Sequence, residues 1–225
     1  IQATHFDSRK LGNRQGLTGL FGRFADRPKD VSFLLDQLDA LRTKLVDFRG
    51  RFDKQVIGVG GHSFGAHTAQ LIGGVSTVGK DGKRASHRDA RVKAVLLISP
   101  QGRGGELDRR SFETLAVPML TITGTRDGGR GGQTFPWRLE PFSYAPPGSK
   151  YAALIEGARH SFGGISGHPP NRRTGPASLE QVTTVKALGL LFWQAHLRDD
   201  EAARTLLASE RITKETRPAV RGVAG

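Results

Sequence analysis

Residues 61–65 read Gly-His-Ser-Phe-Gly, which has the form G-x-S-x-G. This pattern places a serine, here Ser63, on a sharp turn between a strand and a helix, where its hydroxyl is exposed as a nucleophile. An apolar run over residues 55–59 predicts the strand, and residues 65–72 can form the helix. We attribute both glycines to crowding, since side chains at positions 61 and 65 would collide with the neighbouring strand and helix. Such a turn would also point the backbone amide of Phe64 at a developing oxyanion.

A serine hydroxyl is a weak nucleophile unless a base accepts its proton. For a serine on this kind of turn, the expected chain order is serine, then acid, then histidine. Asp127 and His160 follow Ser63 in that order, and each comes directly after an apolar run, residues 117–123 and 151–156. Because open α/β sheets place their sites at the carboxyl ends of strands, we expect these three residues to meet. The chemistry would be acyl transfer by a Ser-His-Asp triad.

Each of these residues also has a simpler interpretation. Asp127 precedes a glycine and can serve as a turn residue. His160 is one of seven histidines, so its position alone does not select it. His62 lies inside the turn and is badly placed to be the base, and His67 is expected to pack along the helix. The combined order and placement favours the triad.

Two segments resemble phosphate-binding motifs but do not meet the requirements of these motifs. Residues 74–80 fit G-x-x-x-x-G-K, but Asp81 stands where magnesium coordination needs serine or threonine, and the segment follows a helix rather than a strand. Residues 58–63 nearly form the dinucleotide pattern G-x-G-x-x-G, but Ser63 takes the place of its third glycine. We therefore expect no nucleotide site at either segment.

Apolar runs that alternate with helical periodicity indicate the fold. Further strands are predicted over residues 92–99, 117–123 and 151–156. One helix begins at Pro28, a second runs from Ser178, which has capping-box spacing with Gln181, to about Leu197, and a third covers residues 199–209. Near-continuous apolar strands between helices are typical of an α/β protein with a mostly parallel sheet and helices on both faces. The first helix carries one apolar stripe, formed by Val31, Leu34, Leu38, Leu41, Leu45 and Phe48.

The 225 residues are expected to form a single domain, residues 1–225, ending in a basic tail over residues 212–225. Residues 4–27 form a glycine-rich connection with little periodicity. The chain has no cysteine, which excludes disulfides, iron–sulfur clusters, cysteine-ligated zinc and cysteine nucleophiles. The longest apolar runs, such as residues 94–98 and 188–193, are far shorter than the ~18 residues that span a bilayer. No transmembrane segment is therefore predicted.

The formal net charge is +13, which raises non-specific affinity for polyanions. We interpret the charge as a solvated basic surface, because lysine and arginine are scattered along the chain. The alternative is a polyanion-binding basic domain, whose binding would vanish with modest salt. No helix-turn-helix, RNA-binding sheet motif or zinc finger accompanies the charge, so no specific nucleic-acid partner is expected. The densest basic patch, interrupted by Asp81 and Asp89, comprises Lys80, Lys83, Arg84, Arg88, Arg91 and Lys93.

Four segments resemble the α/β-hydrolase superfamily, and more narrowly bacterial serine esterases of the dienelactone-hydrolase-like or platelet-activating-factor-acetylhydrolase-like kind. They are residues 27–33 (RPKDVSF), 61–65 (GHSFG), 123–127 (TGTRD) and 157–163 (GARHSFG). The resemblance covers nearly the whole chain. It implies an α/β-hydrolase fold, a catalytic triad of Ser63, Asp127 and His160, and the Phe64 amide as one donor of the oxyanion hole.

The chain departs from this family in two ways. True dienelactone hydrolases resemble this turn but use cysteine, whereas Ser63 favours ester hydrolysis in the esterase manner. The family's early strands, and the loop that supplies the second oxyanion donor, would lie upstream of Ile1. Residues 1–5 resemble the end of the strand that follows that loop. We therefore expect an N-terminally truncated fragment that lacks its N-terminal strands and half of its oxyanion hole.

The implied reaction is hydrolysis of a small-molecule or polymeric carboxylic ester through an acyl-enzyme, without a metal or organic cofactor. Candidate substrate-pocket residues are Phe64, the loop at Gln101–Gly105 and an aromatic segment. That segment is equally expected as a small hydrophobic cluster beneath a loop. An alternative function is a catalytically silent binding protein with the same fold. The aromatic segment comprises Phe135, Trp137, Phe142 and Tyr144.

Overall fold

A five-stranded sheet forms the centre of the computed structural model, which describes residues 26–44, 53–165, 167, 170–209 and 220–221. The strands lie in the order β1-β4-β5-β6-β7; the first four are parallel, and β7 is antiparallel to β6. Parallel neighbours need crossover connections, and helices supply them here. The strand bounds are β1 (Ile57–His62), β4 (Val92–Ile98), β5 (Met119–Gly124), β6 (Lys150–Ile155) and β7 (Val220–Arg221).

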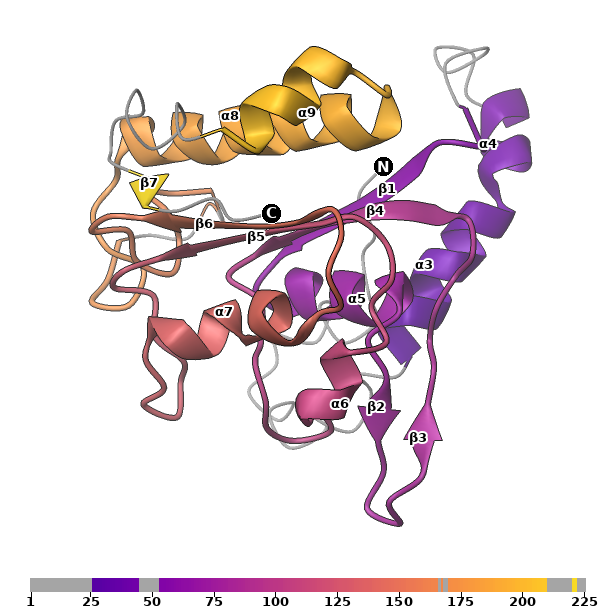
Figure 1. Ribbon diagram of the computed structural model, residues 1–225, viewed down its shortest axis with the longest axis horizontal. Coiled ribbons are helices and arrows are strands. Elements are labelled where there is room, and N and C mark those ends of the chain that lie inside the picture. The colour runs from indigo at the N-terminus through magenta and orange to yellow at the C-terminus, as the bar shows by residue number, and fades with distance from the viewer. Residues whose placement is uncertain (1–25, 45–52, 166, 168–169, 210–219, 222–225) are drawn as a thin grey trace.

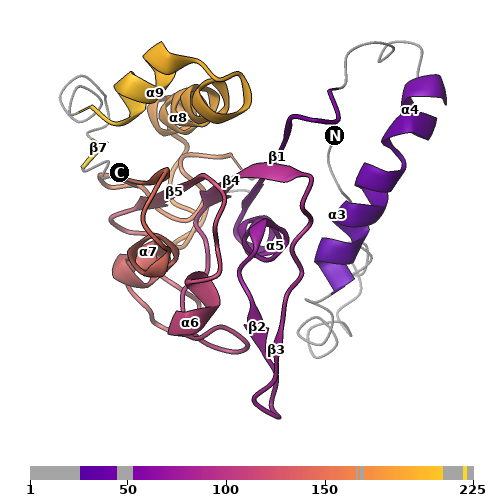
Figure 2. The same ribbon diagram turned by 45° about the vertical axis from the view of Figure 1, so that its right-hand side comes forward.

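Helices cover both faces of this sheet (Figure 1). The long helix α8 (Leu179–Leu197) and the short helix α9 (Glu201–Leu207) lie on one face. On the other lie α5 (Phe64–Gly73), α6 (Arg109–Phe112) and α7 (Phe135–Tyr144), with α3 (Asp26–Asp36) beside α5 (Figure 2). Helix α4 (Leu38–Lys44) continues beyond α3, and a small hairpin of β2 (Thr77–Val78) and β3 (Arg84–Ala85) projects beyond α5. The predicted α/β class, with a mostly parallel sheet flanked by helices, is confirmed.

Two apolar clusters hold the layers together. Along β4, Ala94 and Leu96 belong to the cluster that includes Phe192 of α8. Val95 and Leu97 alternate with them and belong to the cluster on the α5 side. Both faces of this strand are therefore buried, which explains its near-continuous apolar sequence.

Several predicted element bounds change in the structure. The first strand begins at Ile57 and continues through His62, so it contains glycines that the prediction placed after it. A Cβ atom on Gly58 would lie 2.5 Å from the Trp193 ring, which shows why α8 can pack so closely on β1. The helix predicted from Pro28 begins at Asp26 and is interrupted at Gln37, where α3 gives way to α4. The Ser178 hydroxyl accepts a hydrogen bond from the amide of Gln181, which confirms this half of the predicted capping box, whereas the Ser178 amide donates to the carbonyl of Gly163 instead of to Gln181.

Some predictions concern residues outside the described part of the chain. These include the strand end at residues 1–5, the loop over residues 4–25, and the stripe positions Leu45 and Phe48. Within the predicted loop, Asp26 and Arg27 are described and are helical, so that prediction is wrong for these two residues. Within the predicted basic tail, Val220 and Arg221 are described and pair with β6.

Candidate active site

Ser63 lies at the junction of β1 and α5 with φ 57° and ψ −114°. A positive φ is strained for a residue with a side chain, and it persists where the surroundings fix the backbone. The Ser63 amide donates to the carbonyl of Ile98 over 2.9 Å, and its carbonyl accepts from the amide of His67 over 3.0 Å. The predicted strand-turn-helix arrangement with Ser63 at the turn is confirmed.

The two glycines of this turn are not equivalent. A Cβ atom on Gly61 would lie 2.2 Å from the backbone carbonyl carbon of Gly65, so the turn closes only without a side chain at position 61. A Cβ atom on Gly65 would meet nothing within 4 Å among the described residues. The prediction that crowding excludes a side chain is therefore confirmed for Gly61 and wrong for Gly65. Gly61 is crowded because it lies against the backbone of Gly65.

The structure brings the three predicted catalytic residues together. Ser63 Oγ lies 3.0 Å from His160 Nε2, and His160 Nδ1 lies 2.9 Å from Asp127 Oδ1. The three residues follow β1, β6 and β5, so their proximity results from the common edge at which these parallel strands end. Asp127 is fully buried and His160 is 5% exposed. This is the geometry of a nucleophile, a base and an acid that orients the base.

Direct backbone contacts fix the loops that carry the acid and the base. The Arg126 amide donates to the carbonyl of Ala158 over 3.0 Å, which joins the loop after β5 to the loop after β6. A Cβ atom on Gly124 would lie 2.1 Å from that same carbonyl oxygen, so only glycine allows this approach. The separation of Asp127 and His160 is therefore set by backbone packing as well as by their own hydrogen bond.

The Asp127 carboxylate is buried but well supplied with donors. Thr123 Oγ1 donates to Oδ2 over 3.1 Å, and His160 Nδ1 lies 2.9 Å from Oδ1. Burial raises the pKa of Asp127, but hydrogen bonds from His160 and Ser99 and the charge of Arg138 outweigh it. The net result is a pKa below its usual value, so the carboxylate is ionised where the site would work.

His160 is kept neutral by its surroundings. Burial is the main cause that lowers its pKa, and the charges of Arg173 and Arg138 act in the same direction. The hydrogen bond to Asp127 and its charge oppose these effects without cancelling them. Because a neutral imidazole is the form that accepts a proton from serine, this shift favours the base.

His62 supports His160 from the side of β1. Its Nε2 lies 2.6 Å from the backbone carbonyl oxygen of His160, and the two ring centroids lie 4.8 Å apart. The expectation that His62 is not the base agrees with this placement. His67, expected to pack along its helix, is buried, and its Nε2 lies 3.1 Å from Glu106 Oε1.

Sequence reasoning missed Arg138, which the structure places beneath the acid. It lies on α7 and is 3% exposed, with Nε 3.4 Å from Asp127 Oδ1. No sequence signal singles it out from the 34 lysines and arginines, because its position depends on how α7 packs. Helix α7 is formed by the aromatic segment, for which the sequence left two interpretations open, a substrate pocket or a hydrophobic cluster beneath a loop.

The structure also gives the positions of the remaining predicted site residues. Phe64 opens α5, so its amide belongs to the first turn, at the positive end of the helix dipole. The main chain of Gln101 forms two hydrogen bonds with the buried side chain of Gln70. Trp137 Nε1 donates to the carbonyl of Arg103 over 2.7 Å, so its ring is held against the loop that follows β4. Phe135 begins α7 and is partly buried. Their role in substrate binding stays a prediction.

Other candidate sites find no support in the described part of the chain. Residues 74–80 follow α5 and lead into the β2–β3 hairpin, so they do not form a strand-loop-helix phosphate site. Within the residues that the structure describes, no three histidine, aspartate or glutamate side chains are grouped to hold a metal ion. No described helix has both the length and the apolar sequence required to cross a membrane.

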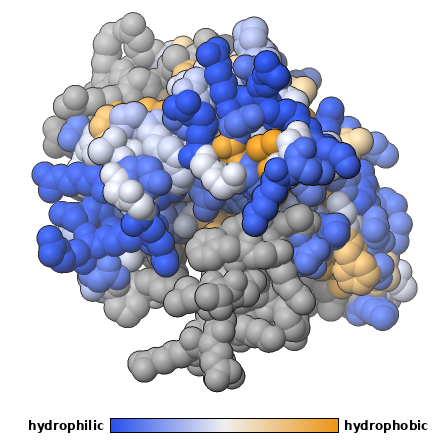
Figure 3. All heavy atoms as spheres, turned by 90° about the horizontal axis from the view of Figure 1, so that it is seen from below, coloured by the Kyte–Doolittle hydropathy of each residue, from blue (hydrophilic) through white to orange (hydrophobic). Residues whose placement is uncertain are grey.

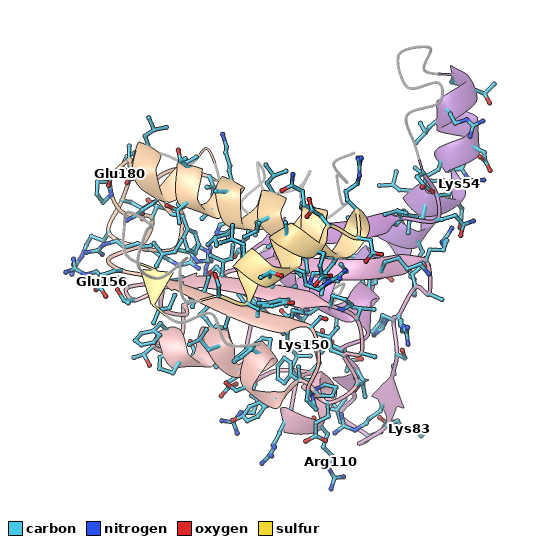
Figure 4. All side chains as sticks on the ribbon, turned by 45° about the horizontal axis from the view of Figure 1, so that its top comes forward. Lys54, Lys83, Arg110, Lys150, Glu156 and Glu180 are labelled. Carbon is cyan, nitrogen blue, oxygen red and sulfur yellow. The ribbon has the colours of Figure 1, made fainter. Side chains whose placement is uncertain are left out.

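The basic patch is partly neutralised by its neighbours. Arg91 pairs with Asp89 over 2.6 Å and with Asp36 over 2.8 Å, and Arg84 pairs with Asp108. Charged side chains such as Lys83 and Arg110 extend into solvent (Figure 4), and the face seen from below is mostly hydrophilic (Figure 3). This agrees with a solvated basic surface.

Comparisons with known proteins do not assign the site. No protein-family model matches the sequence, and no curated protein matches it.

Proposed function

We propose that the protein is a serine hydrolase that cleaves carboxylic esters through an acyl-enzyme, on an α/β-hydrolase fold like that of dienelactone-hydrolase-like esterases. The observation that carries the proposal is the chain of contacts from Ser63 Oγ to His160 Nε2 at 3.0 Å and from His160 Nδ1 to Asp127 Oδ1 at 2.9 Å. The strained backbone of Ser63 supports it, because such strain is concentrated at functional sites.

The reaction follows from the roles of these atoms. His160 Nε2 accepts the hydroxyl proton as Ser63 Oγ attacks the ester carbonyl, which forms a tetrahedral intermediate. The same nitrogen then gives the proton to the departing alkoxide, and an acyl-serine remains. A water molecule, deprotonated by His160, attacks the acyl-serine; the acid is released and Ser63 regains its proton.

Electrostatics supports the charged states along this path. The ionised Asp127 faces Nδ1 and stabilises the imidazolium that forms while Nε2 holds the serine proton. The Phe64 amide, at the start of α5, is the proposed donor to the oxyanion. Both groups are fixed before the reaction begins, which is what gives such donors their effect.

Hydrolysis of p-nitrophenyl butyrate by the protein and by its Ser63→Ala variant tests the proposal. We expect turnover by the wild type and a loss of ~10³-fold or more in the variant. A fluorophosphonate probe should label the wild type at Ser63, as mapped by peptide mass spectrometry, and should not label the variant. If both folded proteins are equally inactive and unlabelled, the proposed function is wrong.

The basic surface is tested separately. Binding to heparin or duplex DNA that disappears with modest salt and does not depend on Ser63 would reflect surface charge alone.

A further inference from the structure

Arg138 is a buried cation next to the proposed triad. Its side chain is 3% exposed, and burying an uncompensated guanidinium is very costly. Compensation comes from Asp127, since Arg138 Nε lies 3.4 Å from Oδ1 of that carboxylate. Burial itself lowers the pKa of Arg138, and the charge of Asp127 opposes that change. The pair is therefore a charged contact inside the protein rather than a surface ion pair.

The two terminal nitrogens of Arg138 bind three backbone carbonyls. Nη1 donates to the carbonyls of Ser99 and Pro100 over 3.1 and 2.8 Å, and Nη2 donates to the carbonyl of Gly128 over 3.0 Å. Ser99 and Pro100 follow β4, and Gly128 follows both β5 and the acid itself. We call these three hydrogen bonds, with the contact to Asp127, the Arg138 clamp. The planar guanidinium suits this task because its donors point in fixed directions.

The clamp holds a strained residue that faces the base. Ser99 has φ 54°, a conformation that residues with side chains seldom adopt. Its Oγ lies 2.9 Å from His160 Nδ1, the nitrogen that also faces Asp127. A hydrogen bond from Ser99 also helps to lower the pKa of Asp127. Arg138 thus holds the main chain of the residue that carries this hydroxyl.

We infer that Arg138 is a positioning residue of the proposed hydrolase, which holds Asp127 and Ser99 against the imidazole of His160. The inference rests on the proposed function, and it adds a residue that acts through the acid without touching the substrate. The geometry of the triad then depends on α7 as well as on the three strands that carry its members. Displacing such a group by about 1 Å can cost ~10²-fold in rate.

The hydrogen bonds of Arg138 position the groups around His160, but its positive charge disfavours the protonated form of His160. Nη2 lies 3.5 Å from His160 Nδ1, so the guanidinium repels the imidazolium. The charged and titratable groups around His160 come from four elements: Asp127 after β5, Arg138 on α7, His62 on β1, and Arg173 in the segment whose carbonyl accepts from the His160 amide. Removing either arginine charge should raise the pH at which His160 titrates, whereas only Arg138 forms the clamp.

Three variants separate geometry from charge. Arg138→Lys keeps the charge but cannot form the three-carbonyl contact, Arg138→Met removes both, and Arg173→Met removes a charge that also acts on His160. For each we would measure kcat and KM of ester hydrolysis from pH 4.5 to 9, with far-UV circular dichroism and fluorophosphonate labelling of Ser63 to count folded sites.

For Arg138→Lys we expect a plateau kcat about 10-fold lower, with KM and the acid midpoint nearly unchanged. For Arg138→Met we expect a loss of about 10²-fold and a raised midpoint. For Arg173→Met we expect a raised midpoint with plateau kcat within about 3-fold of wild type. A plateau kcat of folded Arg138→Lys within about 3-fold of wild type would overturn the inference.

A double-mutant cycle with Asp127 distinguishes an effect through the acid from general damage to the protein. It also keeps the inference testable if the single Arg138 variants do not fold. In the Asp127→Asn background, adding Arg138→Met should lower kcat by less than about 3-fold, because Arg138 acts through the acid. The double variant also leaves no buried charge unpaired. A full additional loss would show damage unrelated to Asp127 and would overturn the inference.

The proposed function can fail independently of this inference. If Ser63→Ala hydrolyses the ester as well as wild type does, the function is wrong. The His160 titration is then followed by NMR, which needs no turnover. A midpoint and Nδ1 proton resonance unchanged in Arg138→Met would overturn the positioning role as well.

Discussion

His62 and His160 form a pair in which one ring supports the main chain of the other residue. His62 Nε2 lies 2.6 Å from the His160 carbonyl oxygen, and since a carbonyl only accepts, this nitrogen carries the proton. Burial, together with the charge of His160, lowers the pKa of His62 to about 4, so the ring is neutral at neutral pH.

The His62 shift predicts a pH-dependent loss of stability. Its pKa is about 4 in the folded protein and 6.5 in the reference state, so the unfolded chain binds more protons between these values. The contribution is complete above pH 6.5 and is lost as the pH falls toward 4, up to about 3 kcal/mol. Urea unfolding of wild type and His62→Gln at pH 7.5 and 4.5 measures it, and the wild type should lose more stability.

The comparison with His62→Gln is needed because other histidines contribute in the same window. Burial also lowers the pKa of His87, His160 and His196, and these residues are present in both proteins. Only the difference between the two proteins reports on His62. Equal losses in both would mean that His62 does not titrate as its burial indicates.

The parts of the fold that could be predicted are those with a strong local signal. Residues 92–98 are almost continuously apolar because both faces of β4 are buried, and Ser178 caps α8 through a local contact. Helix α7 has no such signal, since Pro141 lies inside it and four of its ten residues are aromatic. Its helical form depends on packing against β5, β6 and α6, which a single sequence does not display.

The same distinction applies to the site. Ser63, Asp127 and His160 could be predicted because each lies near the end of a recognisable strand and their order carries information. Ser99 and Arg138 could not, because a serine before proline and an arginine among aromatics are ordinary in sequence. Their importance appears only when three loops and one helix meet at the edge of the sheet.

The pKa of His160 predicts the acid limb of the rate profile. Burial lowers that pKa below 6.5, and His160 must be neutral to accept the Ser63 proton. We therefore expect the acid midpoint of the kcat/KM profile to lie below pH 6.5. Initial rates from pH 4.5 to 8.5 in buffers of constant ionic strength test this, and a midpoint above pH 7 would contradict it.

The unequal glycines of the turn predict unequal effects of alanine. Gly61→Ala would place Cβ 2.2 Å from the Gly65 backbone, so we expect a loss of about 3 kcal/mol or more, together with loss of Ser63 labelling. Gly65→Ala meets no described atom and lies in a helix, where alanine is favoured by about 1 kcal/mol, so it should fold normally. Thermal unfolding and probe labelling of both variants decide; equal damage would show that Gly65 is crowded too.

Two threonines of β5 offer a matched test of the hydrogen bond to the acid. Thr123 Oγ1 donates to Asp127 Oδ2 over 3.1 Å, whereas the buried Thr121 hydroxyl has no hydrogen-bond partner among the described residues. Thr123→Val should cost about 1.5–3 kcal/mol because the lost bond is to a charged group. Thr121→Val should be neutral or stabilising by about 1 kcal/mol, because it removes an unpaired buried hydroxyl. Urea unfolding at pH 7.5 measures both changes, and equal values would show that the Thr123 bond contributes nothing beyond packing.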